Sequence, residues 1–262
     1  MSHGDVFQCS VEDRVALVTI NRPPLNVLPA ACYHELCNIV LGLIERKDAR
    51  AVIITGSNKV FISGLDIKDI NAIKTTEENH QTTLAVKALF RRIEKLPRPV
   101  IAAIDGNCFG GGLELAVSCH MRLASPEARL ALPEIKVGTI PSFGGTQRLP
   151  RILGRAKALE LMLTGRTVSG EEALSIGLVN AIYPSAELID QAKALARQIA
   201  EKNYEAVEAV VRATTEGLEM EFDEGSVFES TCSSELTGTY NMKEGMAAFF
   251  ERRKPVFKDE QS

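Results

Sequence analysis

Strand-like and helix-like segments alternate along the first half of the chain, and this alternation restricts the possible folds more than any other feature. Residues 51–55 form an apolar, β-branched run typical of a buried strand, whereas Leu36, Ile39 and Leu43 recur at the spacing of one helix face. Strands that alternate with helices indicate a helix-flanked α/β core. The pattern predicts strands over 14–20, 51–55, 100–104 and 121–124, and helices over 30–47, 82–95 and 113–119.

The segment after Arg151 is predicted to be helical, with no further strands. It contains no internal repeat and no low-complexity linker that would mark a sharp boundary. We therefore expect an α/β core that holds the site over residues 1–195, and a C-terminal helical region over 196–262. Within this part, helices are predicted over 155–163, 169–176, 186–201, 204–216 and 242–252.

Composition and charge exclude several classes of protein. The 262 residues are 45% apolar and 24% charged, a usual mix for a soluble globular protein, and no apolar run has the length of a membrane span. A formal net charge of −4 argues against a nucleic-acid partner or an anionic membrane. The six cysteines show no Cys-x-x-Cys spacing and the N-terminus has no apolar leader, so we expect reduced thiols, no bound metal and a cytoplasmic protein.

The most informative segment covers residues 105–114, which follow a predicted strand and enter a predicted helix. Three consecutive glycines, Gly110 to Gly112, let the backbone approach a ligand closely, and N–H groups at a helix start create a positive potential. The Gly-Lys-Ser/Thr end of a phosphate-binding loop is absent, and so is the Gly-x-Gly-x-x-Gly pattern of a dinucleotide-binding loop. Glu114 follows one helical turn after Gly111, so its carboxylate is either a partner of the helix dipole or a functional group beside these N–H groups.

Two further segments place polar groups among apolar ones. Glu134 lies between two apolar residues in a Pro- and Gly-rich stretch that is not regular helix. A carboxylate in such surroundings either has a raised pKa and serves as a general acid, or caps nearby N–H groups. Residues 63–68 place Gly64 beside Leu65, whose N–H can point into a cavity, although the same pattern is also that of an ordinary turn before a helix.

In combination these motifs resemble the crotonase superfamily, and most closely its enoyl-CoA hydratase branch. The resemblance extends from Asn21 to the basic C-terminal end at 250–255, and is carried by 63–68, 110–114, 133–134 and 144–148. It implies an α/β fold, a crotonase-like spiral of ββα units with a helical C-terminal trimerisation region. It also implies a homotrimer or a dimer of trimers.

The resemblance further implies which residues form the site. The backbone N–H groups of Leu65 and Gly111 would form an oxyanion hole for a thioester carbonyl, and Glu114 and Glu134 would be the catalytic carboxylates. The substrate would be an acyl-CoA, with coenzyme A as part of the substrate and no separate cofactor. Arg252 would reach the CoA phosphates, from the same or a neighbouring subunit. The residues implied to bind substrate or CoA are Leu25, Asn26, Val27, Ser63, Asp66, Ile67, Lys68, Ser142 and Arg252.

These residues predict that water is added across the 2,3 double bond of an enoyl-CoA. Hydration builds an enolate, which two N–H donors stabilise, while one carboxylate orients water and the other protonates the α-carbon. Ser142 and Phe143 stand where many hydratases have Gly-Ala, which leaves a cyclic or dienoyl-CoA substrate open. The alternatives are an enoyl-CoA isomerase, another crotonase-type acyl-CoA enzyme, or an RNA-binding relative. The second carboxylate argues against the isomerase, and the negative charge and scarce aromatic residues argue against RNA binding.

Overall fold

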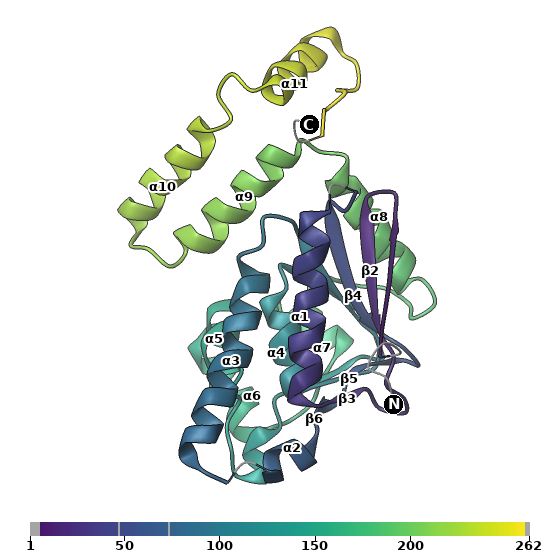
Figure 1. Ribbon diagram of the computed structural model, residues 1–262, viewed down its shortest axis with the longest axis vertical. Coiled ribbons are helices and arrows are strands. Elements are labelled where there is room, and N and C mark those ends of the chain that lie inside the picture. Colours follow the sequence, from purple (N-terminus) through teal and green to yellow (C-terminus); the bar gives the residue numbers. More distant parts are fainter. Residues whose placement is uncertain (1–5, 47, 73, 260–262) are drawn as a thin grey trace.

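The computed structural model describes residues 6–46, 48–72 and 74–259, and two sheets wrapped by helices form its core (Figure 1). The larger sheet has the strand order β1-β2-β4-β7-β9-β12. β1 and β2 form an antiparallel hairpin, and the remaining neighbours pair in parallel. The strands are β1 (Phe7–Glu12), β2 (Val15–Ile20), β4 (Ala51–Gly56), β7 (Val100–Ile104), β9 (Met121–Ala124) and β12 (Ala181–Ile182).

The smaller sheet collects the strand that follows each central strand of the larger sheet. β5 follows β4, β8 follows β7 and β10 follows β9, and the order in the sheet is β11-β10-β8-β5. Each such pair of strands leads into a helical segment, which gives the spiral of ββα units that the resemblance implied. The strands are β5 (Val60–Ile62), β8 (Asn107–Phe109), β10 (Arg129–Ala131) and β11 (Val168–Ser169), and a separate pair joins β3 (Val27–Leu28) to β6 (Gly64–Leu65).

Helices cover both faces of the larger sheet. On one face the main core includes the fully buried rings of Tyr33 and Phe90, and on the other face α8 contributes Leu188 to a second cluster with Ile53. The helices are α1 (Ala30–Glu45), α2 (Ile67–Ala72), α3 (Thr76–Glu94), α4 (Gly111–Ser118), the 3₁₀ helix η2 (Glu134–Val137), α5 (Gly145–Leu153), α6 (Arg155–Thr164), α7 (Gly170–Ser175), α8 (Leu188–Ala200), α9 (Tyr204–Gly217), α10 (Phe222–Ser234) and α11 (Tyr240–Glu251).

The predicted elements are present, with ends that differ by a few residues. The helix predicted over 82–95 begins earlier, at Thr76, because Thr75 and Glu78 form a capping box in which the Thr75 hydroxyl accepts the N–H of Glu78. The helix predicted over 30–47 ends at Glu45, and Lys47 lies outside the described residues. The prediction of no strand after Arg151 is wrong, since β11 and β12 each add two residues to a sheet edge. Strands this short are created by pairing and leave no periodic pattern.

The C-terminal helices extend away from the sheets, with α9 and α10 as an antiparallel pair and α11 beyond them (Figure 1). Large apolar side chains on this region are exposed, among them Leu218, Phe222, Phe249 and Phe250. The predicted division at residues 195 and 196 falls within α8 and stays a prediction. Across the described residues, no helix combines the length and apolar character needed to cross a membrane.

Candidate active site

A cavity of about 400 Å³ brings together the three segments that the sequence singled out. It lies between β6, the first turn of α4, η2 and the loop before α5, and α3 closes one side. The predicted site residues that line this cavity are Ser63, Leu65, Gly111, Glu114, Glu134 and Ser142. Segments separated by some 70 residues of chain therefore meet around one volume that can hold a small acyl group.

The glycine loop connects β8 to α4 and passes so close to its neighbours that side chains have no room there. Gly110 has φ of 55°, a region that favours glycine, and a Cβ added at Gly111 would lie 2.7 Å from the Tyr33 hydroxyl. As the first residue of α4, Gly111 has no intrahelical acceptor for its N–H, which stands at the positive end of the helix. Leu65 borders the same cavity from β6, so both residues predicted to hold a thioester carbonyl are adjacent to it.

Glu114 is almost fully buried, with 2% of its surface exposed. Its Oε1 accepts hydrogen bonds from the backbone N–H groups of Phe143 at 2.7 Å and Gly145 at 2.8 Å, which leaves Oε2 available to a ligand. Burial, and to a smaller extent the nearby charge of Glu134, raise the pKa of this carboxyl to about 8, although the two N–H groups and Arg148 oppose the increase. The side chain is therefore fixed in direction and titrates near neutral pH.

Glu134 is the first residue of η2 and lies against the glycine loop. Its Oε1 is 3.1 Å from the position that a Cβ on Gly110 would take, and within the described structure its buried Oε2 has no hydrogen-bond partner. Burial raises the pKa of Glu134 to about 7. Because both carboxyls border one cavity and both titrate near neutrality, we treat them as a coupled pair that shares one proton at intermediate pH.

Aromatic rings support the loop that holds Glu114. Phe143 packs edge-to-face against Tyr33 at 5.8 Å and against Phe90 at 6.1 Å between ring centroids. Tyr33 and Phe90 also pack edge-to-face, so three rings from α1, α3 and the loop before α5 meet behind the cavity. The Tyr33 hydroxyl and the Ser63 hydroxyl are buried and have no hydrogen-bond partner among the described residues.

The residues predicted from the 25–27 loop do not line this cavity. Leu25 is half exposed and Val27 belongs to β3. Asn26 is buried, its Nδ2 donates to the carbonyl of Val60 at 2.7 Å, and its Oδ1 accepts the N–H of Arg22 at 2.7 Å. The side chain of Asn26 thus holds the loop in place, and a contact of this loop with CoA stays a prediction.

Among the described side chains, those of Asp66, Lys68 and Arg252 do not line the cavity either. The Asp66 Oδ1 accepts the N–H of Lys68 at 3.0 Å, and Lys68 is exposed. Ile67 begins α2, and its side chain lies outside what the structure describes. Arg252 is exposed at the end of α11, at the opposite end of the molecule from α2 (Figure 1). One chain does not bring Arg252 to this cavity, so a role across a subunit boundary stays a prediction.

Several residues that line the cavity were not predicted from the sequence. Asn79, Thr82 and Thr83 contribute polar groups from α3, and Thr139 and Ile140 come from the loop after η2. Asn79 was missed because the helix was predicted to begin at 82, and the others because only packing brings α3 and this loop over the site. Among the described residues, no group of three His, Cys, Asp or Glu is placed to hold a metal ion.

Comparisons with known proteins agree with this geometry. A profile of the family described as "Enoyl-CoA hydratase/isomerase" matches residues 10–260. The chain is 40% identical over 257 residues to a "Probable enoyl-CoA hydratase" of Bacillus subtilis (strain 168), covering 98% of this chain and 100% of the relative. It is 41% identical over 246 residues to a "Short-chain-enoyl-CoA hydratase" of Clostridium acetobutylicum, covering 93% and 94%.

A solved structure shows the same fold. The crystal structure of an enoyl-CoA hydratase from Bacillus anthracis superposes with a TM-score of 0.92 at 34% identity, covering 97% of this chain and 100% of that one. The fold and site thus define an enzyme of the crotonase superfamily. The chain belongs to the enoyl-CoA hydratase/isomerase family, as the sequence motifs predicted.

Proposed function

We propose that this enzyme adds water across the 2,3 double bond of an enoyl-CoA thioester. The observation that carries this proposal is the pair of carboxyls, the buried Glu114 and the partly buried Glu134, beside the first turn of α4 in one cavity. Hydration needs both a group that orients water and a group that protonates carbon, and two carboxyls of opposite protonation state can supply them. An isomerase, which shuttles one proton, needs only one.

In the proposed reaction the thioester carbonyl accepts hydrogen bonds from the N–H groups of Leu65 and Gly111. As water attacks the β-carbon, negative charge develops on the carbonyl oxygen, and the helix N-terminus and both donors stabilise it. Glu114 orients and deprotonates the attacking water, and Glu134 delivers a proton to the α-carbon. The two hydrogen bonds to Glu114 Oε1 support its place beside the water, because they fix the direction of Oε2. Because the pKa of Glu114, about 8, lies above that of Glu134, about 7, the shared proton rests mainly on Glu114 in the free enzyme and passes to Glu134 before the water is activated.

The acyl group is not fixed by the family. Ser142 and Phe143 line the cavity, and Phe143 is held rigidly by two other rings, so a flat or cyclic acyl group is a candidate beside a short straight chain. The test measures the rate of hydration of crotonyl-CoA and of a cyclic dienoyl-CoA side by side. The loss of the absorbance of the conjugated thioester reports each rate. Fast turnover of crotonyl-CoA alone would assign a short-chain hydratase. Fast turnover of the cyclic ester alone would assign the unusual substrate.

The pH dependence of the reaction should be bell-shaped. Below about pH 7 both carboxyls hold protons, so neither activates water, and above about pH 8 both are ionised, so neither protonates carbon. We therefore expect kcat/KM for the free enzyme to be highest between these values and to fall on both sides. A profile with a single acidic limb and no fall at alkaline pH would contradict the shared proton.

We further propose that the chain assembles as a homotrimer or a dimer of trimers through its C-terminal helices. The exposed apolar side chains support this, since Phe222 is 86% and Phe250 is 81% exposed in the single chain. Sedimentation should give a mass of about three or six times 28.5 kDa. The Phe222→Glu and Phe250→Glu double variant should sediment as a smaller species, and a monomeric wild type would contradict the proposal.

A further inference from the structure

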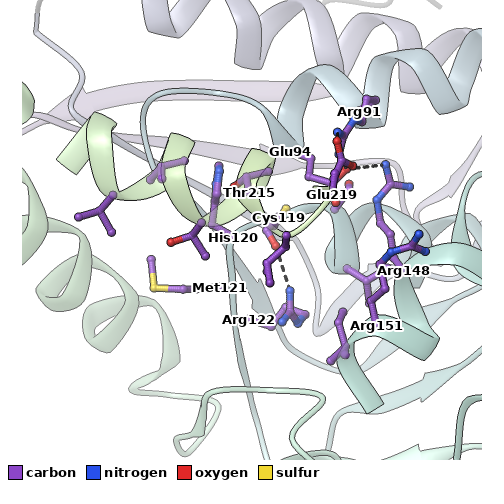
Figure 2. Close-up of a pocket in the computed structure, with 17 residues that line it drawn as sticks. Arg91, Glu94, Cys119, His120, Met121, Arg122, Arg148, Arg151, Thr215 and Glu219 are labelled. Atoms are coloured by element: carbon purple, nitrogen blue, oxygen red, sulfur yellow. Dashed lines mark hydrogen bonds and ion pairs between the residues drawn. The ribbon is translucent and has the colours of Figure 1, made fainter. Parts of the chain in front are cut away.

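A second cavity, of about 430 Å³, lies at the end of α4 opposite to the catalytic cavity and is bordered by α9 (Figure 2). Several charged residues on its wall form a connected network. Arg91 pairs with Glu219, which follows α9, and its Nη1 donates to Glu94 Oε2 at 2.8 Å. The Nη2 of Arg148 donates to the same Glu94 oxygen at 3.1 Å. Figure 2 shows these side chains converging at one end of the cavity.

Arg148 extends from this network to the loop that holds Glu114. Its Nη1 donates to the backbone carbonyl of Phe143 at 3.2 Å. That carbonyl belongs to the peptide between Phe143 and Gly144, which lies between the two peptides whose N–H groups bind Glu114 Oε1. The Arg148 guanidinium therefore holds the peptide between Phe143 and Gly144. The peptides on either side of it donate the two N–H groups that orient the Glu114 carboxylate.

The fit of Arg148 against this loop is close. Gly144 has φ of 114°, and a Cβ added there would lie 2.0 Å from the Arg148 Nη1. The Arg148 side chain is only 11% exposed, and its buried Nε has no hydrogen-bond partner within the described residues. A buried cation with one carboxylate partner and one carbonyl partner is held in a single orientation, unlike a surface arginine.

We propose that Arg148 is a positioning residue that holds the loop of Phe143 to Gly145 in the geometry that orients Glu114. The inference rests on the proposed hydration, in which Glu114 orients water. Without the guanidinium, the central peptide can rotate, and both N–H groups lose their alignment with Oε1. The charged groups that face Glu114 are Glu134 and Arg148, and the nearby Tyr33 hydroxyl is uncharged. Losing Arg148 also removes the positive charge that favours ionised Glu114.

The test compares Arg148→Met, Arg148→Lys and Arg151→Met in hydration of crotonyl-CoA, with kcat, KM and the pH profile of each. Arg151 lies on the same helix and the same cavity wall, but among the described residues its side chain donates only to the carbonyl of Gln147, so it serves as the matched control. We expect Arg148→Met to lower kcat about 10- to 100-fold with KM little changed, and to move the alkaline limb to higher pH. Arg148→Lys should lower kcat and leave that limb in place, and Arg151→Met should match the wild type.

A role in stability alone would lower the thermal midpoint of Arg148→Met and leave its pH profile and kcat unchanged, and this result would overturn the inference. If Arg148→Met does not fold, Glu94→Gln is the second variant, because it keeps the shape of the Arg148 partner and removes its charge. A folded Glu94→Gln enzyme with wild-type kcat and pH profile would also overturn the inference. Absence of hydration by the wild type would count instead against the proposed function, so the two failures are distinguishable.

Discussion

Replacing Glu114 with glutamine is expected to lower kcat for hydration by about 10²–10⁴-fold while the protein stays folded. Glutamine keeps an oxygen that accepts the N–H groups of Phe143 and Gly145, so the loop geometry should survive. What it loses is the ability to take a proton from water. The measurement is the kcat of Glu114→Gln and of Glu134→Gln, each as a single variant. A kcat near that of the wild type in either one would contradict the assigned roles.

The same substitution has an expected effect on stability that is independent of activity. Burial raises the pKa of Glu114 from its ordinary 4.5 to about 8, so the folded protein binds a proton that the unfolded chain releases. The stability of the wild type should therefore fall as the pH rises through this window, and Glu114→Gln lacks this contribution while it keeps the smaller one of Glu134. We expect the thermal midpoint of the variant, relative to the wild type, to increase from pH 5 to pH 8. A constant difference across this range would contradict the raised pKa.

The second large effect is expected for Gly111→Ala. The new Cβ would lie 2.7 Å from the Tyr33 hydroxyl, and Tyr33 is fully buried between Phe90 and Phe143, so the backbone of α4 must move. Such a shift displaces the N–H proposed to hold the developing oxyanion, and the loss of one such donor typically costs 10²–10³-fold in kcat. We expect a loss of this size in steady-state kinetics.

Tyr33→Phe provides the control for this prediction. It removes only the hydroxyl that the added methyl would meet, so the double variant Gly111→Ala with Tyr33→Phe should recover part of the lost kcat. Tyr33→Phe alone should keep most of the activity, because no role in the reaction is assigned to its hydroxyl. A double variant as impaired as Gly111→Ala would show that the contact with the Tyr33 hydroxyl does not cause the loss.

The long elements of the fold were predictable because their patterns are local. Residues 51–55 and 100–104 are continuous apolar runs, and both are strands at the centre of the larger sheet. β3, β6, β11 and β12 have two residues each and exist because a neighbouring strand pairs with them, which no local pattern records. Fold class therefore follows from periodicity, whereas the sheet edges follow from tertiary pairing.

In the site, too, some residues were singled out by local sequence patterns, whereas other features depend on tertiary contacts. Spacing from the glycine loop and apolar neighbours singled out Glu114 and Glu134 but left their roles open, and the resemblance to the crotonase superfamily implied that both are catalytic. The sequence could not indicate that the backbone of Phe143 and Gly145 orients Glu114, since the donors are peptide groups about 30 residues away. The sequence also could not indicate that the side chain of Asn26 is occupied by hydrogen bonds to the backbone of Arg22 and Val60, and its predicted contact with substrate stays a prediction.

The most direct test of the account is the fate of oxygen when the enzyme converts crotonyl-CoA in water labelled with oxygen-18. If the enzyme hydrates the double bond, the wild type forms a 3-hydroxyacyl-CoA that carries the label at the β-carbon. We expect neither Glu114→Gln nor Glu134→Gln to form this labelled product at a comparable rate. A product with a shifted double bond and no label would contradict it and assign an isomerase. Label in a free carboxylic acid would likewise contradict it and assign a thioester hydrolase.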